Sequence, residues 1–369
     1  KMALIKLNTR SIPDNAVTPA KVSQNLGRRN LMTNGDFKVA QRGTTFATAA
    51  TGTMVSDRWS PLASTNPNQN IGYTRSTDAP KGFKYSTKLA VSTAISSLAS
   101  TDYYIFRHRG FEQQDIEHLN FGTADAKEIT LSFWVKSNKT GTMFAEWQMP
   151  TSSASIELGK PYTIDVANTW EYKTITYPAN TVHTSNAADN AGGLYLYMWI
   201  AAGATYAGGT LNTSWNNNSN RVTGITNYLD STSNEIYFTG FQLEVGDTAT
   251  EFEHRSYVEE LALCSRYYQN SFDEGNTPGA STAYGNGIHV LSWSDGNAQG
   301  IPFQVPMRTA PTMTFRPEAS NTTGVVSSAG TNRSATATRV GTKQVSYIAV
   351  ASGTASTYVR FTWEANAEL

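Results

Sequence analysis

The chain has 369 residues, of which 39% are hydrophobic and 16% are charged, so it can bury one or two sizeable cores. Its 29 basic and 29 acidic residues cancel, and this balance provides no field to hold nucleic acid or anionic lipid. No apolar run approaches the roughly 18 residues that span a bilayer, and a single cysteine, Cys264, excludes an internal disulfide framework. We therefore expect a protein assembled in a cytoplasm, without nucleic acid and without membrane insertion.

The first 28 residues differ from the rest of the chain. Their apolar residues are spaced too irregularly for an amphipathic helix, two prolines interrupt them, and no partner strand lies nearby in sequence. The segment would become ordered if copies from several chains wound around a common axis and shared a core. The apolar residues available for that core are Ile5, Leu7, Ile12, Val17 and Val22. The alternative is a disordered tail, because terminal segments fray unless they are docked.

Residues 30–43, NLMTNGDFKVAQRG, read as a polar turn between two stretches with strand character. Asn34 and Gly35 are the residues expected to reverse the chain. This places a boundary near Arg29, between a segment that folds only when several chains associate and a domain that folds as a single chain.

Most of the remaining chain has the regularly spaced turn residues of an all-β protein. Short runs rich in β-branched and aromatic residues alternate with clusters of Ser, Asn and Gly, which favours a sandwich. The clearest predicted strands are residues 128–136, 141–149, 170–177, 193–201 and 235–245. Four more are expected in the last hundred residues, around GIHVLSW, GIPFQV, KQVSYIAV and STYVRFTW. The prediction is a jelly-roll β-sandwich over residues 29–255 and a smaller β-sandwich over residues 271–369.

One segment between these domains predicts a helix over residues 256–270. Ser256 and Glu259 have the spacing of a capping box, in which each side chain bonds the other residue's amide. The helix would place Tyr257, Leu261, Cys264 and Tyr268 on one stripe. Such a helix either packs between the domains or lies at a subunit contact.

Four separate stretches, in the same order, resemble bacteriophage tail fibre and receptor-binding proteins. They are residues 11–37 with SDRWS at 56–60, residues 238–269, residues 301–315, and the ending FTWEANAEL at 361–369. The resemblance implies a homotrimeric virion protein of the tail fibre or tip that adheres to a bacterial surface polysaccharide. It also implies that the N-terminal segment attaches to other tail proteins.

A second resemblance concerns a metal. NLMTNGDF looks like the first strand of jelly-roll carbohydrate-binding modules, and YFTGFQLEV looks like their last strand. Many of those modules hold a structural calcium through an aspartate in the last strand, where this chain has Thr239. Because a threonine cannot supply the carboxylate that Ca²⁺ prefers, we expect no cofactor, with Asp36 as the remaining weak calcium candidate.

Sugar sites combine flat aromatic rings with a few convergent hydrogen-bonding groups. By strand alternation, Tyr195, Tyr197 and Trp199 share one face of their strand, and this face is a sugar platform, an inter-domain contact or a trimer seam. Trp147 could join the same surface. Trp215 and Asn216, in an asparagine-rich loop, form another candidate, or else a flexible turn.

The C-terminal domain is the expected tip, because the distal end of such fibres commonly meets the host. Its loops supply candidate contacts, and three copies of a weak site would bind with avidity. These candidates are Tyr284, Asn286, His289, Trp293 and Asp295.

An enzymatic role would need paired carboxylates, and the run GFEQQDIEHL offers Glu112, Asp115 and Glu117 together with His118. The chain has no nucleophile elbow, phosphate loop or His-rich metal motif, and no repeating rungs of a β-helical depolymerase. We therefore expect a non-catalytic adhesin. The alternatives are a polysaccharide-degrading tail spike and a structural spacer without its own receptor site.

Overall fold

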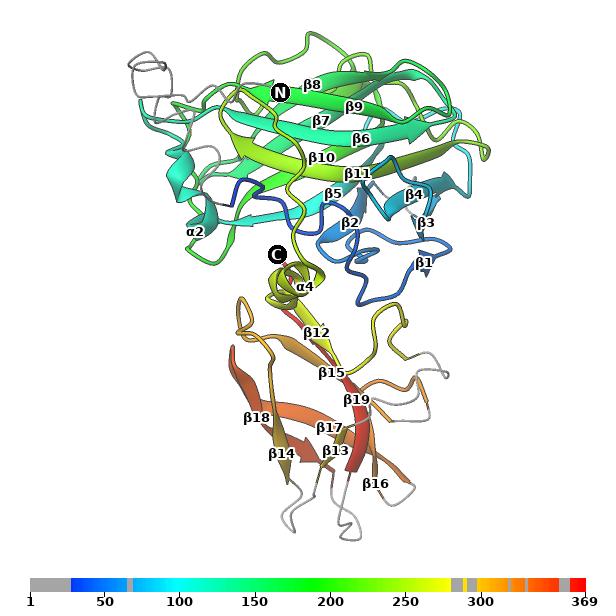
Figure 1. Cartoon of the computed structure of the whole chain (residues 1–369), viewed down its shortest axis with the longest axis vertical. Helices are drawn as coiled ribbons and strands as arrows, with labels where there is room; N and C mark the ends of the chain where they lie inside the picture. The colour runs from blue at the N-terminus through cyan, green and yellow to red at the C-terminus, as the bar shows by residue number, and fades with distance from the viewer. Residues whose placement is uncertain are drawn as a thin grey trace, which may run out of the picture.

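The computed structural model describes residues 28–64, 69–279, 288–290, 297–317, 320–328, 331–351 and 359–369. These residues form two β lobes stacked end to end and joined by a neck that contains helix α4 (Tyr257–Ser265) (Figure 1). The predicted all-β class is confirmed, because strands make up nearly all of the regular structure. The predicted trimerisation segment lies outside the described residues, apart from Arg28. In the described part of the chain, no helix is long and apolar enough to cross a membrane.

The larger lobe is a sandwich of two antiparallel sheets, with strands distributed between the sheets as in a jelly roll. The six-stranded sheet has the order β1 (Thr45–Phe46), β3 (Ile71–Ser76), β4 (Ser86–Val91), β11 (Glu235–Val245), β6 (Ile129–Ser137) and β9 (Glu171–Tyr177). The five-stranded sheet has the order β2 (Trp59–Ala63), β5 (Tyr103–Glu112), β10 (Gly192–Ala202), β7 (Gly141–Pro150) and β8 (Ser155–Ile164). Three short helices connect strands: α2 (Gln113–Ile116), η1 (Glu117–Leu119) and α3 (Ala204–Ala207).

The core of this lobe lies between the two sheets and is rich in aromatic rings. Trp59 stacks on Phe106 with ring centroids 4.9 Å apart, and Phe133 stacks on Phe241 at 5.2 Å. Each fully buried large apolar side chain contributes roughly 1.5–3 kcal/mol through the hydrophobic effect. The five strands that the sequence predicted here are confirmed as β6, β7, β9, β10 and β11, with bounds that agree to within one residue.

Residues 30–43 are not a turn between two strands, as the sequence predicted, because no strand occurs between Arg28 and Thr45. The segment instead runs beside β11: Leu31 N donates to Leu243 O at 3.0 Å, and Phe241 N donates to Gly35 O at 3.0 Å. Asn34 has a φ of 54°, and its buried amide donates to Val39 O at 3.0 Å. Gly35 is required by this close approach, because a Cβ there would lie 2.2 Å from Phe241 O.

The smaller lobe is built around strand β19 (Val359–Asn366), which pairs with four other strands. Its remaining strands are β12 (Tyr268–Asn270), β13 (Ile288–Val290), β14 (Asn297–Pro302), β15 (Thr312–Arg316), β16 (Val325–Ser328), β17 (Thr331–Val340) and β18 (Gln344–Val350). They surround a separate core that includes Phe315, Val345, Ile348 and Phe361. The four strands expected in this region appear as β13, β14, β18 and β19.

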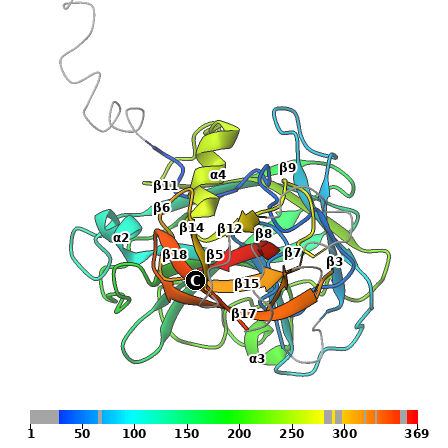
Figure 2. The same ribbon diagram turned by 90° about the horizontal axis from the view of Figure 1, so that it is seen from below.

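Helix α4 begins where the capping box predicted. Glu259 N donates to Ser256 Oγ at 3.3 Å, and Ser256 N donates to Glu259 Oε2 at 2.8 Å. The predicted helix was too long, however, because it ends at Ser265 and residues 268–270 form β12 instead. Pairing of these residues with β19 outweighs continuation of the helix. One side of α4 faces outward, where Val258 is 72% exposed (Figure 2).

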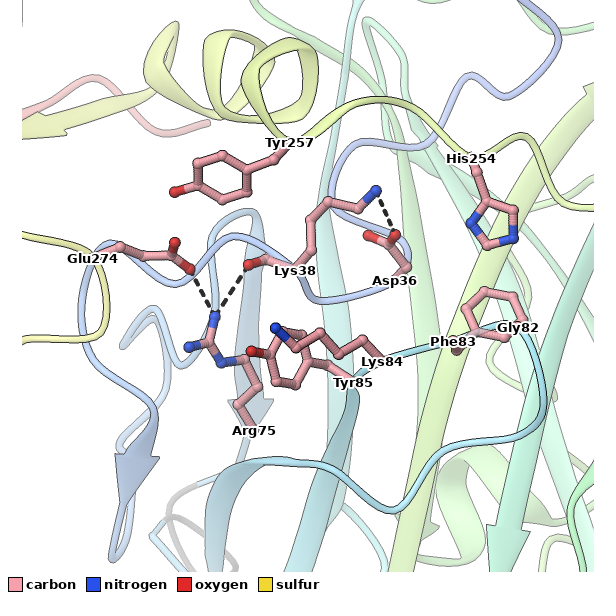
Figure 3. A pocket seen from close by; sticks show the side chains of 10 residues that line it. All are labelled: Asp36, Lys38, Arg75, Gly82, Phe83, Lys84, Tyr85, His254, Tyr257 and Glu274. Atoms are coloured by element: carbon pink, nitrogen blue, oxygen red, sulfur yellow. Dashed lines mark hydrogen bonds and ion pairs between the residues drawn. The ribbon is translucent and has the colours of Figure 1, made fainter.

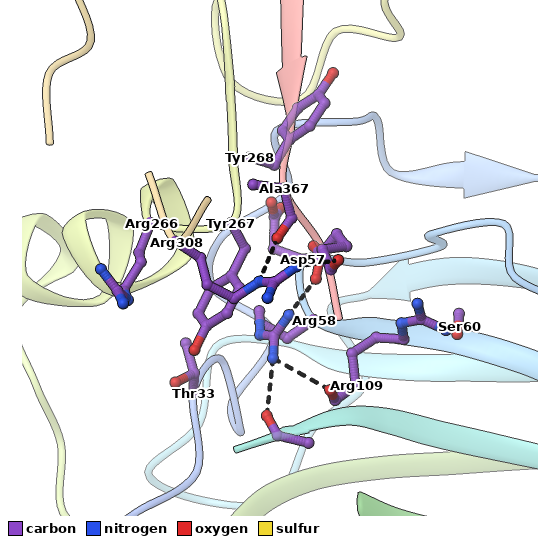
Figure 4. A network of polar contacts seen from close by, with 12 residues as sticks. Thr33, Asp57, Arg58, Ser60, Arg109, Arg266, Tyr267, Tyr268, Arg308 and Ala367 are labelled. Carbon is purple, nitrogen blue, oxygen red and sulfur yellow. Dashed lines mark hydrogen bonds and ion pairs between the residues drawn. The ribbon is translucent and has the colours of Figure 1, made fainter. Parts of the chain in front are cut away.

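A buried ionic network joins the two lobes at the neck (Figure 4). Glu368, beside the C-terminus, forms ion pairs with Arg58 and, at 3.1 Å, with Arg42. Arg42 also reaches Asp57 at 3.1 Å, and the Arg58 guanidinium lies 3.4 Å from the centroid of the Tyr267 ring. Burial opposes ionisation of Glu368, but the two arginines outweigh it and lower the pKa of this carboxyl. These contacts hold the lobes in one arrangement.

Candidate functional site

A pocket of about 420 Å³ opens beside the neck, at the edge of the larger lobe (Figure 3). Its volume lies within the roughly 300–1,000 Å³ that is usual for small-ligand sites. Five separate segments supply its walls: the loop after Arg28, strand β3, the β3–β4 loop, the start of α4 and the loop after β12. The residues that line it are Asp36, Lys38, Arg75, Gly82, Phe83, Lys84, Tyr85, His254, Tyr257 and Glu274.

The β3–β4 loop is held in place by strand β11. Thr239 Oγ1 donates to Tyr85 O at 2.7 Å, so this threonine anchors the wall of the pocket. Gly240 has a φ of +66°, and a Cβ there would meet the Phe83 ring at 2.7 Å. The loop can therefore lie close to the sheet only because position 240 carries no side chain.

Two ion pairs fix the charged side chains of the pocket. Lys38 Nζ lies 2.8 Å from Asp36 Oδ2, and Arg75 Nη1 lies 2.7 Å from Glu274 Oε1. Arg75 Nη1 also donates to Lys38 O at 3.0 Å, which ties the two pairs together. Burial and the neighbouring Glu274 carboxylate raise the pKa of Tyr257, so its hydroxyl stays protonated.

Aromatic rings form the other part of the pocket wall. The Phe83 and His254 rings have centroids 5.3 Å apart, and both contact Phe252 behind them. Tyr257 is 40% exposed and extends into the pocket from the first turn of α4 (Figure 3). This combination of ring faces with charged hydrogen-bonding groups can bind a ligand that has apolar C–H faces and polar substituents.

The predicted alternation along β10 is confirmed, but the predicted sugar platform is wrong. Tyr195, Tyr197 and Trp199 lie on the face opposite the main core. That face is covered by the segment of residues 203–226, so Tyr197 is 5% exposed and Trp199 is 1% exposed. Trp199 Nε1 donates to Glu146 Oε2 at 3.0 Å beneath this cover. The aromatic stripe is therefore a second small core.

Arg221 holds the covering segment down on two buried carboxylates. Its Nη2 lies 3.1 Å from Glu157 Oε1, and its Nη1 lies 3.6 Å from Glu146 Oε1. Burial, and the charge of Glu157, raise the pKa of Glu146 to about 8. Burial also raises the pKa of Glu157, with Arg221 opposing it, and Glu146 retains its proton near neutral pH.

The other predicted glycan-binding residues, Trp147, Trp215 and Asn216, also make structural contacts within the larger lobe. Trp147 is fully buried, because it faces the core between the sheets and not the surface of Trp199. Trp215 is 7% exposed, and its Nε1 donates to Pro178 O at 2.8 Å. Asn216 exchanges two backbone hydrogen bonds with Glu157, at 2.7 and 3.1 Å. This loop is therefore fixed against β8 and is not a flexible turn.

The predicted tip contacts cannot be placed. Tyr284, Asn286, Trp293 and Asp295 lie outside the described residues. His289 lies in β13, where its backbone pairs with Arg360, and its side chain is also outside the description.

The carboxylates of GFEQQDIEHL do not form a catalytic pair. Glu112 is fully buried, and its two oxygens accept from Arg266 at 2.5 and 2.6 Å and from the Tyr267 hydroxyl at 2.9 Å. Burial opposes ionisation, but these donors, with Arg266 foremost, lower the pKa of Glu112. Asp115, Glu117 and His118 are exposed on α2 and η1.

Asp36, the weak calcium candidate, is held in an ion pair. One of its oxygens is bound by Lys38, and the other is buried without a hydrogen-bond partner among the described residues. Within those residues, no group of three or more His, Cys, Asp or Glu side chains gathers in a way that could hold a metal ion. Asp36 also lines the wall of the pocket.

Comparison with solved structures finds distant matches. No family model matches the chain, and no curated protein matches it. Among solved structures, it is similar to the enzymatically active domain of tailspike protein 4 of bacteriophage CBA120, with 14% identity and a TM-score of 0.31. This match covers 58% of the chain and 21% of the tailspike chain, so the chain spans about a fifth of that protein.

Two further similar structures are smaller. One is the C-terminal family 22 carbohydrate binding module of Clostridium thermocellum Xyn10B, with 10% identity, a TM-score of 0.31, and coverage of 57% of this chain and 98% of that one. The other is a putative sugar binding protein from Bacteroides thetaiotaomicron, with 11% identity, a TM-score of 0.33, and coverage of 59% and 100%.

Proposed function

We propose that this protein binds a bacterial surface glycan in the pocket between the β3–β4 loop and the start of α4. The observation that carries the proposal is the composition of the pocket wall, where exposed rings stand beside fixed charged groups. Sugars present apolar faces and a rim of hydroxyls, which this arrangement matches. The site is built on loops held by a rigid sandwich, as recognition sites commonly are.

The biological setting of the proposal is the tail of a bacteriophage. Four stretches of the sequence resemble tail fibre and receptor-binding proteins and occur in the same order along the chain, which supports this setting. In this setting the protein is a homotrimer located in the virion, attached to other tail proteins through its N-terminal segment. Its glycan is a lipopolysaccharide or a capsule, and three copies of the pocket bind with avidity.

The proposed binding is non-catalytic. Three buried carboxylates, those of Glu112, Glu157 and Glu368, are engaged by arginine partners. General acid–base cleavage of a glycan needs two carboxyl groups facing the scissile bond. In the pocket, Asp36 and Glu274 are each bound by a cation.

Tyr257→Ala is expected to weaken glycan binding at least about tenfold, because it removes an exposed ring from the pocket wall. Binding of the full chain to purified bacterial surface polysaccharide measures the effect. Tyr172→Ala is the matched control, since Tyr172 is 44% exposed on β9 and does not line the pocket. Equal losses in both variants would count against the pocket. Shortened glycans after incubation would instead indicate a depolymerase, and no retained glycan would indicate a spacer.

The proposed trimer is tested by light scattering on the full chain. We expect three chains per particle at micromolar concentration, because the apolar residues of the N-terminal segment have no partner within their own sequence neighbourhood. A monomer at that concentration would contradict the shared core of residues 3–27.

A further inference from the structure

The hydrogen-bonding groups of the pocket are unequally used. The acceptors are mostly engaged by the protein or out of reach: Asp36 Oδ2 is bound by Lys38 Nζ at 2.8 Å, while Asp36 Oδ1 has no partner among the described residues but is buried away from the pocket surface. Glu274 Oε1 accepts from Arg75 Nη1 at 2.7 Å and from Ala40 N at 3.2 Å, and the same carboxylate faces the Tyr257 hydroxyl. A ligand in this pocket therefore meets few free anionic groups.

The donors, in contrast, are left over. Lys84 lies on the exposed rim, and among the described residues no carboxylate forms an ion pair with it. Arg75 uses Nη1 for both of its acceptors. Its Nη2 has no acceptor among the residues that the structure describes. Three cations and two anions line the pocket, so its formal charge is positive before His254 is considered.

One aromatic ring positions both of these cations. The Arg75 guanidinium lies 4.5 Å and the Lys84 ammonium 5.0 Å from the centroid of the Tyr85 ring. Tyr85 is in turn fixed through its carbonyl by Thr239 on β11. The free donors are thus held together on one wall and are not scattered over the surface (Figure 3).

We infer that the pocket selects an acidic saccharide, one whose sugar ring carries a carboxylate or a phosphate that Lys84 and Arg75 bind. This inference rests on the proposed function and narrows it to a ligand class. An anionic oxygen accepts the charge-assisted hydrogen bonds that these donors leave unmade, and such bonds are about twice as strong as neutral ones. A neutral sugar would leave the surplus charge uncompensated.

The test uses the full chain on a printed array of neutral, carboxylate-bearing and phosphate-bearing bacterial saccharides. We expect acidic saccharides to be retained over neutral ones, with the retained class identifying the anionic group. Lys84→Gln should lower affinity for them at least tenfold, and raising the salt concentration should weaken binding of the unmodified protein. Lys81→Gln is the matched control, because Lys81 is exposed in the same loop but does not line the pocket.

The outcomes separate this inference from the function on which it rests. Equal retention of neutral and acidic saccharides, or unchanged binding of acidic ones by Lys84→Gln, would overturn the acidic specificity and leave glycan binding intact. Retention of no saccharide at all would overturn both. Because Lys84 is exposed, thermal unfolding of Lys84→Gln should match that of the unmodified protein, so that a loss of binding reports on the pocket.

Discussion

Replacing Glu368 with alanine is expected to lower the free energy of unfolding by about 3–5 kcal/mol, the usual cost of removing one partner from a buried ion pair. Arg58 is 1% exposed and Arg42 is 8% exposed, so water cannot solvate the guanidinium charges once the Glu368 carboxylate is removed. Urea denaturation followed by tryptophan fluorescence measures the change, since Trp363 in the smaller lobe and Trp59 in the larger lobe are both buried.

Glu251→Ala provides the control, because Glu251 is exposed and its carboxylate has no ion pair among the described residues. The pKa of Glu368 is lowered in the folded protein, so its stabilising contribution exists above the ordinary value of 4.5 and disappears as the pH falls. The difference in the free energy of unfolding between Glu368→Ala and the unmodified protein should therefore become smaller at acidic pH. A Glu368→Ala protein as stable as the control at pH 7 would show that the neck network does not stabilise the fold.

Glu146→Gln is expected to stabilise the protein at alkaline pH. The pKa of Glu146 is raised to about 8 from 4.5, so the folded state gains from the bound proton and loses that gain as the pH rises through about 8. Glutamine does not titrate, and its carbonyl can still accept from Trp199 Nε1. The rise in pKa from 4.5 to about 8 corresponds to about 5 kcal/mol at 1.36 kcal/mol for each pKa unit, so the gain of the variant in the free energy of unfolding between acid and pH 9 should reach about 5 kcal/mol.

The measurement is the free energy of unfolding at pH 5, 7 and 9 for both proteins. Glu117→Gln is the control, because Glu117 is exposed on η1 and its replacement should leave the pH dependence unchanged. Parallel curves for Glu146→Gln and the unmodified protein would mean that Glu146 is already ionised in the folded state.

Local sequence patterns predicted the elements whose cause is local. The capping box at Ser256 and Glu259 defines the start of α4 through contacts three residues apart. Strands β6 and β10 combine alternation with aromatic and β-branched residues, which made them visible. Strand β5 was missed because its outer positions carry Arg107 and Arg109, and the short strands β2 and β3 carry Pro61 and Gly72.

The site depended on contacts that no local pattern contains. Asp36 and Glu274 are more than two hundred residues apart, yet they line one pocket. Trp199 was placed on the correct face of β10, but its burial depends on the covering segment of residues 203–226, in which Arg221 pairs with buried carboxylates on β7 and β8. Alternation predicts which way a side chain points, and only the tertiary fold decides what covers it.

The smaller lobe leaves the neck through β12 and returns to it through β19, and these two strands are hydrogen-bonded neighbours. The C-terminus accordingly lies beside α4 and not at the far end of the molecule (Figure 1). When the two ends of a unit meet at one place, every force between that unit and the rest of the chain passes through the same joint. The strands beyond the neck thus connect to the larger lobe at a single joint, which the Tyr268–Glu364 hydrogen bond and the Arg58–Glu368 ion pair hold together.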